Sequence, residues 1–178
     1  GTNCGLIGKN ACIEVDGTAY WMSENGFFMY DGQLKSLPCL VEDYVYDDLN
    51  TTSRDLINVG LNNLFGEVTW FYCTAGSNVI DRMVTYNYLD SNSKRPIWTT
   101  GSLARAAWQD SSVFEKPHAT YYNPNSNSSY DVIGNTDGCT IYYEQETGTD
   151  QIDAGGAVTA ILASITSGDF DITQRRSN

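Results

Sequence analysis

The sequence has very little of several residue types on which chemical function often depends. Among its 178 residues there is one histidine, and 10 lysines and arginines face 22 acids, giving a net charge of −12. So few bases argue against a nucleic-acid binder held by phosphate contacts. No apolar run is long enough to span a membrane, and no signal peptide is recognisable. The charge favours solubility, or a surface that repels polyanions.

The cysteines also exclude some classes of site. None of the five forms a CxxC pair, which argues against a zinc ribbon or a dithiol redox centre. Isolated cysteines at apolar strand positions are usually small core residues, and we expect this here. The sequons at Asn50 and Asn127 are common by chance, and the missing disulfide pattern argues against secretion. The five cysteines are Cys4, Cys12, Cys39, Cys73 and Cys139.

What the sequence does contain is a set of short alternating runs rich in tyrosine and β-branched residues. The clearest pair lies in residues 65–88, where 67–72 and 83–88 alternate on either side of a Gly-Ser-Asn turn. This pattern predicts two antiparallel strands with aromatic side chains on the matching faces. The residues predicted to share those faces are Val68, Trp70 and Tyr72 on one strand, and Val84, Tyr86 and Tyr88 on the other.

Residues 11–32 predict a compact meander of three strands. Asp16-Gly17 and Asn25-Gly26 separate the runs, and both dipeptides accept the positive φ angles of a type I′ hairpin turn. Residues 96–100, 117–122 and 139–144 predict further strands. The small apolar run over 157–167 predicts a buried inner strand.

The segment between the first two groups of strands has a different pattern. Val41, Tyr44, Val45, Asp48 and Leu49 follow helical spacing, so residues 41–49 predict a short amphipathic helix. A second, Ala-rich segment over 102–108 predicts about one helical turn. Residues 123–137 are polar and predict a loop.

The strands form a loose internal repeat, with Tyr20, Tyr86 and Tyr142 at matching positions of three hairpins. Small antiparallel sheets repeated along a chain are typical of β-propeller blades. We therefore expect one all-β region over residues 1–178. The character of its two ends leads us to expect that it is a fragment of a longer chain. A β-sandwich, built from similar short strands, is the alternative. The expected blade-like units are 5–37, 64–101 and 117–172, with a helical insertion over 38–63.

Carboxylates are the first candidates for catalysis, because glycosidases need two of them flanking a sugar bond. Several acids lie on or beside predicted strands, but Asp90 and Glu146 fall at strand ends, where solvated turn residues are expected. The Asp-box of sialidases is absent. We therefore expect no catalytic pair among these acids, which are Glu67, Asp81, Asp90, Glu144 and Glu146.

The remaining candidates are a histidine, a polar loop and the tryptophans. His118 has no GxSxG-type turn to supply a nucleophile, so a plain strand histidine is the favoured interpretation. Residues 135–138 contain part of an oxygen-ligand pattern for calcium, but lack the further acids of an EF-hand. Sugar stacking is an alternative to core packing for the four tryptophans. They are Trp21, Trp70, Trp98 and Trp108. We expect no catalytic residue, no metal and no cofactor.

Several of these runs, taken in order, resemble the tail nozzle proteins of short-tailed bacteriophages, also called tail tubular or packaged-DNA stabilisation proteins. The resemblance extends from Gly5 to Ile172. Each motif alone is only a strand, so the order carries the resemblance. The motifs are GLIGKNACIEVDGTAYWMSENGFFMYDG, LPC, FGEVTWFY, VTYNY, WTTG, IYYEQETGTD and SGDFDI.

The resemblance implies a structural virion protein containing a β-propeller, made in the cytoplasm of a bacterial host. Such a protein forms a homo-oligomeric ring, expected to be a hexamer, below the portal and the tail adaptor. The ring continues the DNA channel, helps to retain packaged DNA, and docks fibres or spikes. No catalytic residue belongs to this role, so we expect a protein that is not an enzyme. Acidic channel walls would keep passing DNA from sticking.

Two alternatives remain open from the sequence. One is a carbohydrate-binding or glycan-cleaving propeller for host attachment. The other is a propeller that binds a cellular protein partner.

Overall fold

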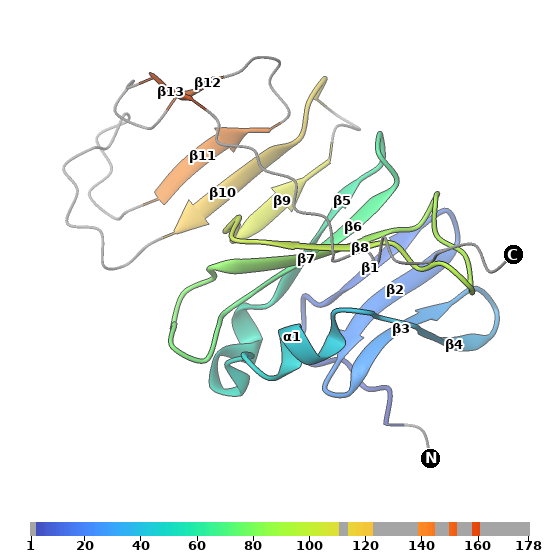
Figure 1. The fold of residues 1–178 in the computed structure, drawn as a ribbon. Helices are drawn as coiled ribbons and strands as arrows, with labels where there is room; N and C mark the ends of the chain where they lie inside the picture. The colour runs from blue at the N-terminus through green and yellow to red at the C-terminus, as the bar shows by residue number, and fades with distance from the viewer. Residues whose placement is uncertain (1–2, 111–113, 123–138, 145–149, 153–157, 161–178) are drawn as a thin grey trace, which may run out of the picture. The chain divides into compact units, whose positions relative to one another are not determined.

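The computed structural model describes residues 3–110, 114–122, 139–144, 150–152 and 158–160 (Figure 1). The chain divides into two compact units, Gly1–Glu146 and Thr147–Asn178. This boundary falls inside the blade-like unit expected over residues 117–172. Within the described residues, regular structure is mostly strand, and every sheet is antiparallel. The all-β prediction is confirmed.

The first sheet is a meander of four strands in chain order. Asp16 and Gly17 form its first turn with φ angles of 49° and 82°, as the type I′ prediction requires. The second turn differs from the prediction, because Ser23 pairs with Gly26 and the loop is Glu24 and Asn25. The strands are β1 (Cys12–Val15), β2 (Thr18–Ser23), β3 (Gly26–Tyr30) and β4 (Leu34–Leu37).

The second sheet is also a four-stranded meander in chain order, and it contains the predicted strand pair. Val68 lies opposite Tyr86, and Trp70 lies opposite Val84. These side chains are at most 9% exposed, so the predicted apolar faces are confirmed. The strands are β5 (Asn58–Asn62), β6 (Glu67–Tyr72), β7 (Arg82–Asn87) and β8 (Trp98–Gly101).

The helical insertion is shorter than the predicted 38–63. The helix expected over 41–49 is α1 (Glu42–Tyr46), followed by a 3₁₀ helix over Thr51–Leu56. The Asn50 side chain caps the 3₁₀ helix by accepting hydrogen bonds from the amides of Thr52 and Ser53. Residues 58–62 belong to β5 and not to the insertion. Their sequence, NVGLN, has a glycine at its centre and asparagine at both ends, which hides the strand.

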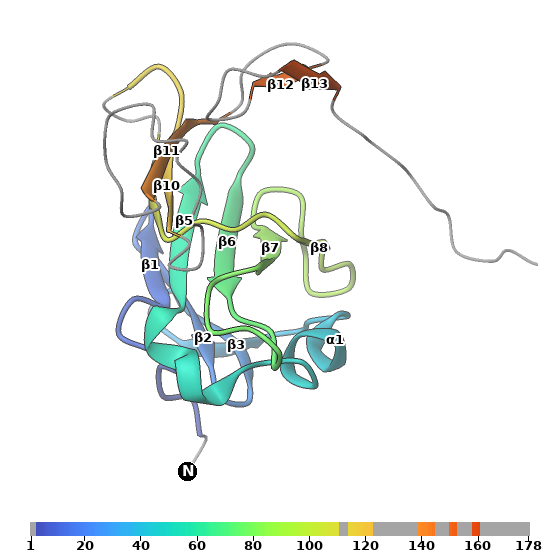
Figure 2. The ribbon, with the colours of Figure 1, turned by 90° about the vertical axis from the view of Figure 1, so that its left-hand side faces the viewer.

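The main core lies between the first and second sheets (Figures 1 and 2). The Phe27 ring on β3 lies 5.0 Å from the Trp70 ring and 4.7 Å from the Trp98 ring, measured between centroids. Val45 of α1 is fully buried at the same core. The Tyr46 hydroxyl donates to the carbonyls of Ser23 and Gly26, which ties α1 to the β2–β3 turn.

A third, three-stranded sheet packs against β5. It consists of β9 (Ala107–Gln109), β10 (His118–Tyr122) and β11 (Cys139–Tyr143), again in chain order. The helical turn predicted over 102–108 is wrong, because residues 107–109 pair with β10 as a strand. Trp108 lies directly over Gly60 of β5, and this tertiary contact outweighs the helical tendency of the alanines.

The second unit contains a two-stranded ribbon, β12 (Asp150–Ile152) and β13 (Val158–Ala160). The strand expected over 157–167 is confirmed where the structure describes it, at β13, but its expected burial is wrong there, because Val158 is 63% exposed. The loop expected over 123–137 lies entirely outside the described residues. No helix in the described part of the chain is long and apolar enough to cross a membrane.

Candidate functional site

The four tryptophans expected either in the core or on a sugar-binding surface all use their indole N–H groups internally. Each N–H donates to a backbone carbonyl of another segment, over 2.7–2.9 Å. None of these donors is therefore available to a ligand. The pairs are Trp21 with Cys4, Trp70 with Ala11, Trp98 with Pro38, and Trp108 with Leu61.

Two of the five candidate acids have local structural roles. Asp81 accepts hydrogen bonds from the amide and the hydroxyl of Thr74, at 2.8 and 2.7 Å, and so closes the loop between β6 and β7. Asp90 is an exposed turn residue whose amide donates to the Asn87 side chain. Glu146 lies outside the described residues.

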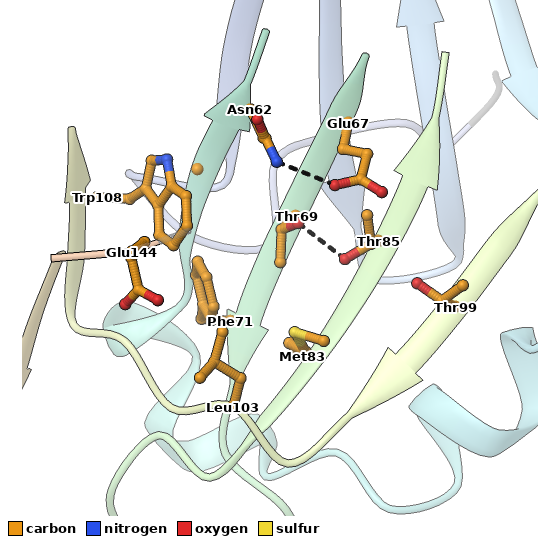
Figure 3. Close-up of a pocket in the computed structure, with 11 residues that line it drawn as sticks. Asn62, Glu67, Thr69, Phe71, Met83, Thr85, Thr99, Leu103, Trp108 and Glu144 are labelled. Atoms are coloured by element: carbon orange, nitrogen blue, oxygen red, sulfur yellow. Dashed lines mark hydrogen bonds between the residues drawn. The ribbon is translucent and has the colours of Figure 1, made fainter. Parts of the chain in front are cut away.

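The other two acids, Glu67 and Glu144, lie in one pocket of about 240 Å³ (Figure 3). The pocket opens on the face of the second sheet that points away from the main core, which we call the outer face. It is smaller than the roughly 300–1,000 Å³ of pockets that hold drug-sized ligands. Its lining residues are Gly60, Asn62, Glu67, Thr69, Phe71, Met83, Thr85, Thr99, Leu103, Trp108 and Glu144.

The strand register explains this outer face. Side chains alternate along β5 to β8, so each apolar core residue is followed by one that faces outward. Pairing then arranges the outward residues in rows across the sheet, and one row contains Thr69, Thr85 and Thr99. The hydroxyls of Thr69 and Thr85 are 2.8 Å apart and hydrogen-bonded. In the neighbouring row, Asn62 lies opposite Glu67.

Asn62 and Glu67 form the polar end of the pocket. The Asn62 amide nitrogen donates to Glu67 Oε2 over 3.2 Å. Asn62 is 9% exposed, and its Oδ1 atom is buried without a hydrogen-bond partner in the described structure. An acceptor left in this state normally indicates a bound water or another donor.

The middle of the pocket is apolar. Phe71 is fully buried and stacks on Trp108, with 6.0 Å between ring centroids. Trp108 can lie this close to β5 because residue 60 is a glycine: a Cβ atom there would be 2.6 Å from Trp108 Cγ. Met83 and Leu103 complete the apolar lining.

The far end of the pocket is an ion pair. Arg105 Nε donates to Glu144 Oε1, and both side chains are nearly buried, at 10% and 14% exposure. The Arg105 guanidinium also lies 4.1 Å from the centre of the Tyr142 ring. Glu144 is thus already neutralised. Figure 3 shows Glu67 and Glu144 on opposite sides of the pocket, with Trp108 and Phe71 beside Glu144.

His118 has a packing role in the described structure. Its ring contacts those of Phe114 and Tyr143, with centroid distances of 4.2 and 4.7 Å. Its Nδ1 atom is buried without a hydrogen-bond partner there. His118 is the first residue of β10, which agrees with the interpretation as a strand histidine.

The cysteines only partly match their predicted core role. Cys73 is 1% exposed, and burial, with Asp81 nearby, raises the pKa of its thiol to about 11. Cys12 is exposed, so the prediction is wrong there, because β1 is an edge strand of its sheet. Among the residues that the structure describes, no three His, Cys, Asp or Glu side chains are grouped to hold a metal ion. The calcium-like segment 135–138 lies outside the described residues.

The Asn50 side chain of the first sequon is used in hydrogen bonds within the protein. Besides capping the 3₁₀ helix, the Asn50 side chain donates from Nδ2 to the Ser77 carbonyl over 2.7 Å. A glycan attached to Nδ2 would disturb this bond. The second sequon, at Asn127, lies outside the described residues.

Sequence reasoning named Glu67, Glu144 and Trp108 separately, but did not predict that they share a pocket. It missed Asn62 and the row of threonines, although strand alternation could have placed the threonines on one face. Comparison with models of known protein families gives no match. No curated protein matches the chain either.

Proposed function

We propose that this chain is a structural part of a bacteriophage tail. In this proposal it belongs to a nozzle, a homo-oligomeric ring that continues the DNA channel, helps to retain packaged DNA, and docks fibres or spikes. The nozzle meets a tail adaptor, and the protein resides in the virion. The resemblance of the ordered strand motifs between Gly5 and Ile172 is the starting point.

The observation that carries the proposal is the stacking of consecutive meanders. The second sheet packs on the first through the main core, and Trp108 of the third sheet covers part of its outer face. A propeller blade is likewise a meander with a neighbour on each face. Face-to-face meanders also occur in β-sandwiches, so the closed propeller is part of the proposal.

The use of the aromatic side chains also supports a structural role. All four indole N–H groups bind backbone carbonyls, and three of the four tryptophans contact Phe27 or Phe71 or each other. In a carbohydrate-binding surface we would expect at least one exposed indole ring for stacking, whereas Trp21 and Trp70 are buried and Trp98 and Trp108 are only partly exposed. The aromatic content therefore serves to hold sheets together.

The charge supports passage of DNA without capture. With 22 acids and 10 bases, the chain repels a polyanion at low ionic strength. We expect no retention of double-stranded DNA in a gel-shift assay, even at low salt. Tight, salt-dependent retention would contradict this part of the proposal.

The deciding experiment is electron microscopy of the protein expressed from its complete reading frame, alone and mixed with the tail adaptor of the same phage. We expect closed rings that bind the adaptor, with an adaptor from an unrelated phage as the matched control. Persistent monomers under both conditions would overturn the proposal. Portal and capsid genes beside the reading frame would support it at little cost.

The carbohydrate-binding propeller remains the second candidate, and the pocket at Glu67 and Trp108 is the observation in its favour. A glycan array together with a reducing-sugar assay tests it. Saturable glycan binding that Trp108→Ala abolishes, in a variant that stays folded, would rank this function above the tail proposal. Release of reducing sugar would make the protein an enzyme, which the tail proposal does not expect.

A further inference from the structure

The pocket on the outer face of the second sheet has three chemically different parts, and together they select a ligand class. We propose that it binds a primary alkylammonium ion, with the ammonium group at Glu67 and the hydrocarbon chain along Phe71 and Met83. This site is separate from the tail function and does not depend on it.

The polar end offers hydrogen-bond acceptors. Glu67 uses Oε2 to accept from Asn62, and no hydrogen bond from the described residues reaches its Oε1. Thr85 and Thr99, from adjacent strands, line the pocket beside it and can accept through their hydroxyl oxygens. An ammonium group, with three donors and a positive charge, matches this set.

The middle of the pocket favours hydrocarbon. Phe71, Met83, Leu103 and Trp108 line it, and the Trp108 N–H is already bound to the Leu61 carbonyl. A ligand therefore gains by burying methylene groups here, at roughly 0.8 kcal/mol per group. The volume of about 240 Å³ admits only a short chain.

The far end restricts the other terminus of the ligand. Glu144 is paired with Arg105, so that end is close to neutral overall. Of this pair only Glu144 lines the pocket, and because Arg105 neutralises it, a second ammonium group would gain little there, whereas a carboxylate would be repelled by Glu144. The terminus should therefore be uncharged, which favours a simple alkylamine or the side chain of a lysine over a diamine.

The test is a titration of the isotope-labelled chain with n-pentylamine at pH 7, followed by amide chemical shifts. We expect saturable shifts on β6 and β7 with a dissociation constant of roughly millimolar order. The neutral isostere 1-pentanol and the anion pentanoate should bind at least about tenfold more weakly, since neither forms a charge-assisted bond with Glu67. Saturation by 1-pentanol at the same concentration, or no saturation by pentylamine, would overturn the proposal.

Variants locate the site. Glu67→Gln should weaken pentylamine binding at least about tenfold. Asp43→Asn, on the exposed face of α1, makes the same charge change and should leave binding unaltered. Equal weakening by both would mean diffuse attraction to an acidic protein, and would overturn the proposal.

A second variant, Thr99→Val, tests the same site in case Glu67→Gln fails to fold. Thr99→Val is nearly isosteric at an exposed position and should weaken binding by about threefold through loss of one acceptor. An unchanged affinity for pentylamine in Thr99→Val would refute the placement of the ammonium group at this end of the pocket. Titration with Nα-acetyl-lysine amide distinguishes the two possible sources of the ammonium group, a lysine side chain and a free alkylamine. Binding as tight as that of pentylamine indicates a lysine side chain, and weaker binding indicates a free amine.

Discussion

Trp70 of the second sheet donates its indole N–H to the Ala11 carbonyl at the start of the first sheet, over 2.9 Å. The same carbonyl accepts from the Met22 amide at 3.1 Å, and both Trp70 and Ala11 are fully buried. One oxygen atom thus connects the two sheets at the centre of the core. The bond explains why a polar indole group can be buried without a penalty.

Replacing Trp70 should therefore damage the fold. We expect Trp70→Ala to lower the free energy of unfolding by about 3–5 kcal/mol, because it leaves a cavity beside Phe27. Trp70→Phe should cost less, about 1–2 kcal/mol, since the ring packing is kept and Ala11 retains its Met22 donor. Urea unfolding followed by far-UV circular dichroism measures both.

Tyr30→Ala is the matched control for this pair. Tyr30 is an aromatic residue of β3 that is 50% exposed, so its removal should cost no more than about 1 kcal/mol. If Trp70→Ala left stability unchanged but removed binding of a ligand, the structural role of this tryptophan would be refuted.

The strands predictable from sequence were those whose pattern is local. Val68, Trp70 and Tyr72 alternate with Glu67, Thr69 and Phe71, so β6 and the face it turns to the core follow from the sequence alone. Asp16-Gly17 likewise specifies its turn through the conformations those two residues tolerate. In both cases residues within about six positions contain the information.

The elements that sequence reasoning missed depend on distant partners. Asn58 donates to the Arg105 carbonyl, and Gly60 lies under Trp108, so β5 is stabilised as a strand by contacts far along the chain. The pocket shows the same limitation. Glu67 and Glu144 come together only because the third sheet packs on β5, and no spacing in the sequence encodes that packing.

The contact between Gly60 and Trp108 gives a second prediction. A Cβ at position 60 would lie 2.6 Å from Trp108 Cγ, so Gly60→Ala must displace the indole from its carbonyl on Leu61. We expect a loss of about 1–3 kcal/mol in thermal or urea unfolding. Gly76→Ala is the control, because nothing lies within 4 Å of its Cβ position. Equal stabilities of the two variants would contradict the close packing of β5 and β9.

The Arg105–Glu144 pair gives a third prediction. Glu144→Gln should cost about 3 kcal/mol, because it leaves the charge of Arg105, a residue 9% exposed, without its counterion. The double variant Arg105→Met with Glu144→Leu should be more stable than Glu144→Gln, since no unpaired charge is left. Chemical denaturation of the three proteins at pH 7 provides the comparison.

An exposed salt bridge elsewhere in the chain serves as the control for Glu144→Gln. Arg54 and Glu24 are 2.8 Å apart with side chains 51% and 55% exposed, so Glu24→Gln should change stability by at most about 1 kcal/mol. If Glu24→Gln and Glu144→Gln cost the same, burial would not be the reason for the larger effect.

Cys73 predicts a loss of stability at alkaline pH. Burial raises the pKa of its thiol from 9.0 to about 11, so the folded protein holds this proton more tightly than the unfolded chain does. The stabilisation is complete below pH 9 and decreases as pH rises from about 9 to 11, where the unfolded chain ionises first. Between pH 8 and pH 10 the contribution of Cys73 to the free energy of unfolding should fall by about 1 kcal/mol.

Urea unfolding of the parent and of Cys73→Ala at pH 7, 8 and 10, with reductant present, measures this contribution. The variant should be less stable than the parent at all three values, because a small cavity remains. The difference in unfolding free energy between parent and variant should be constant between pH 7 and 8, and should narrow by about 1 kcal/mol at pH 10. A difference that stays constant up to pH 10 would show that the Cys73 proton is held no more tightly in the folded state than in the unfolded chain.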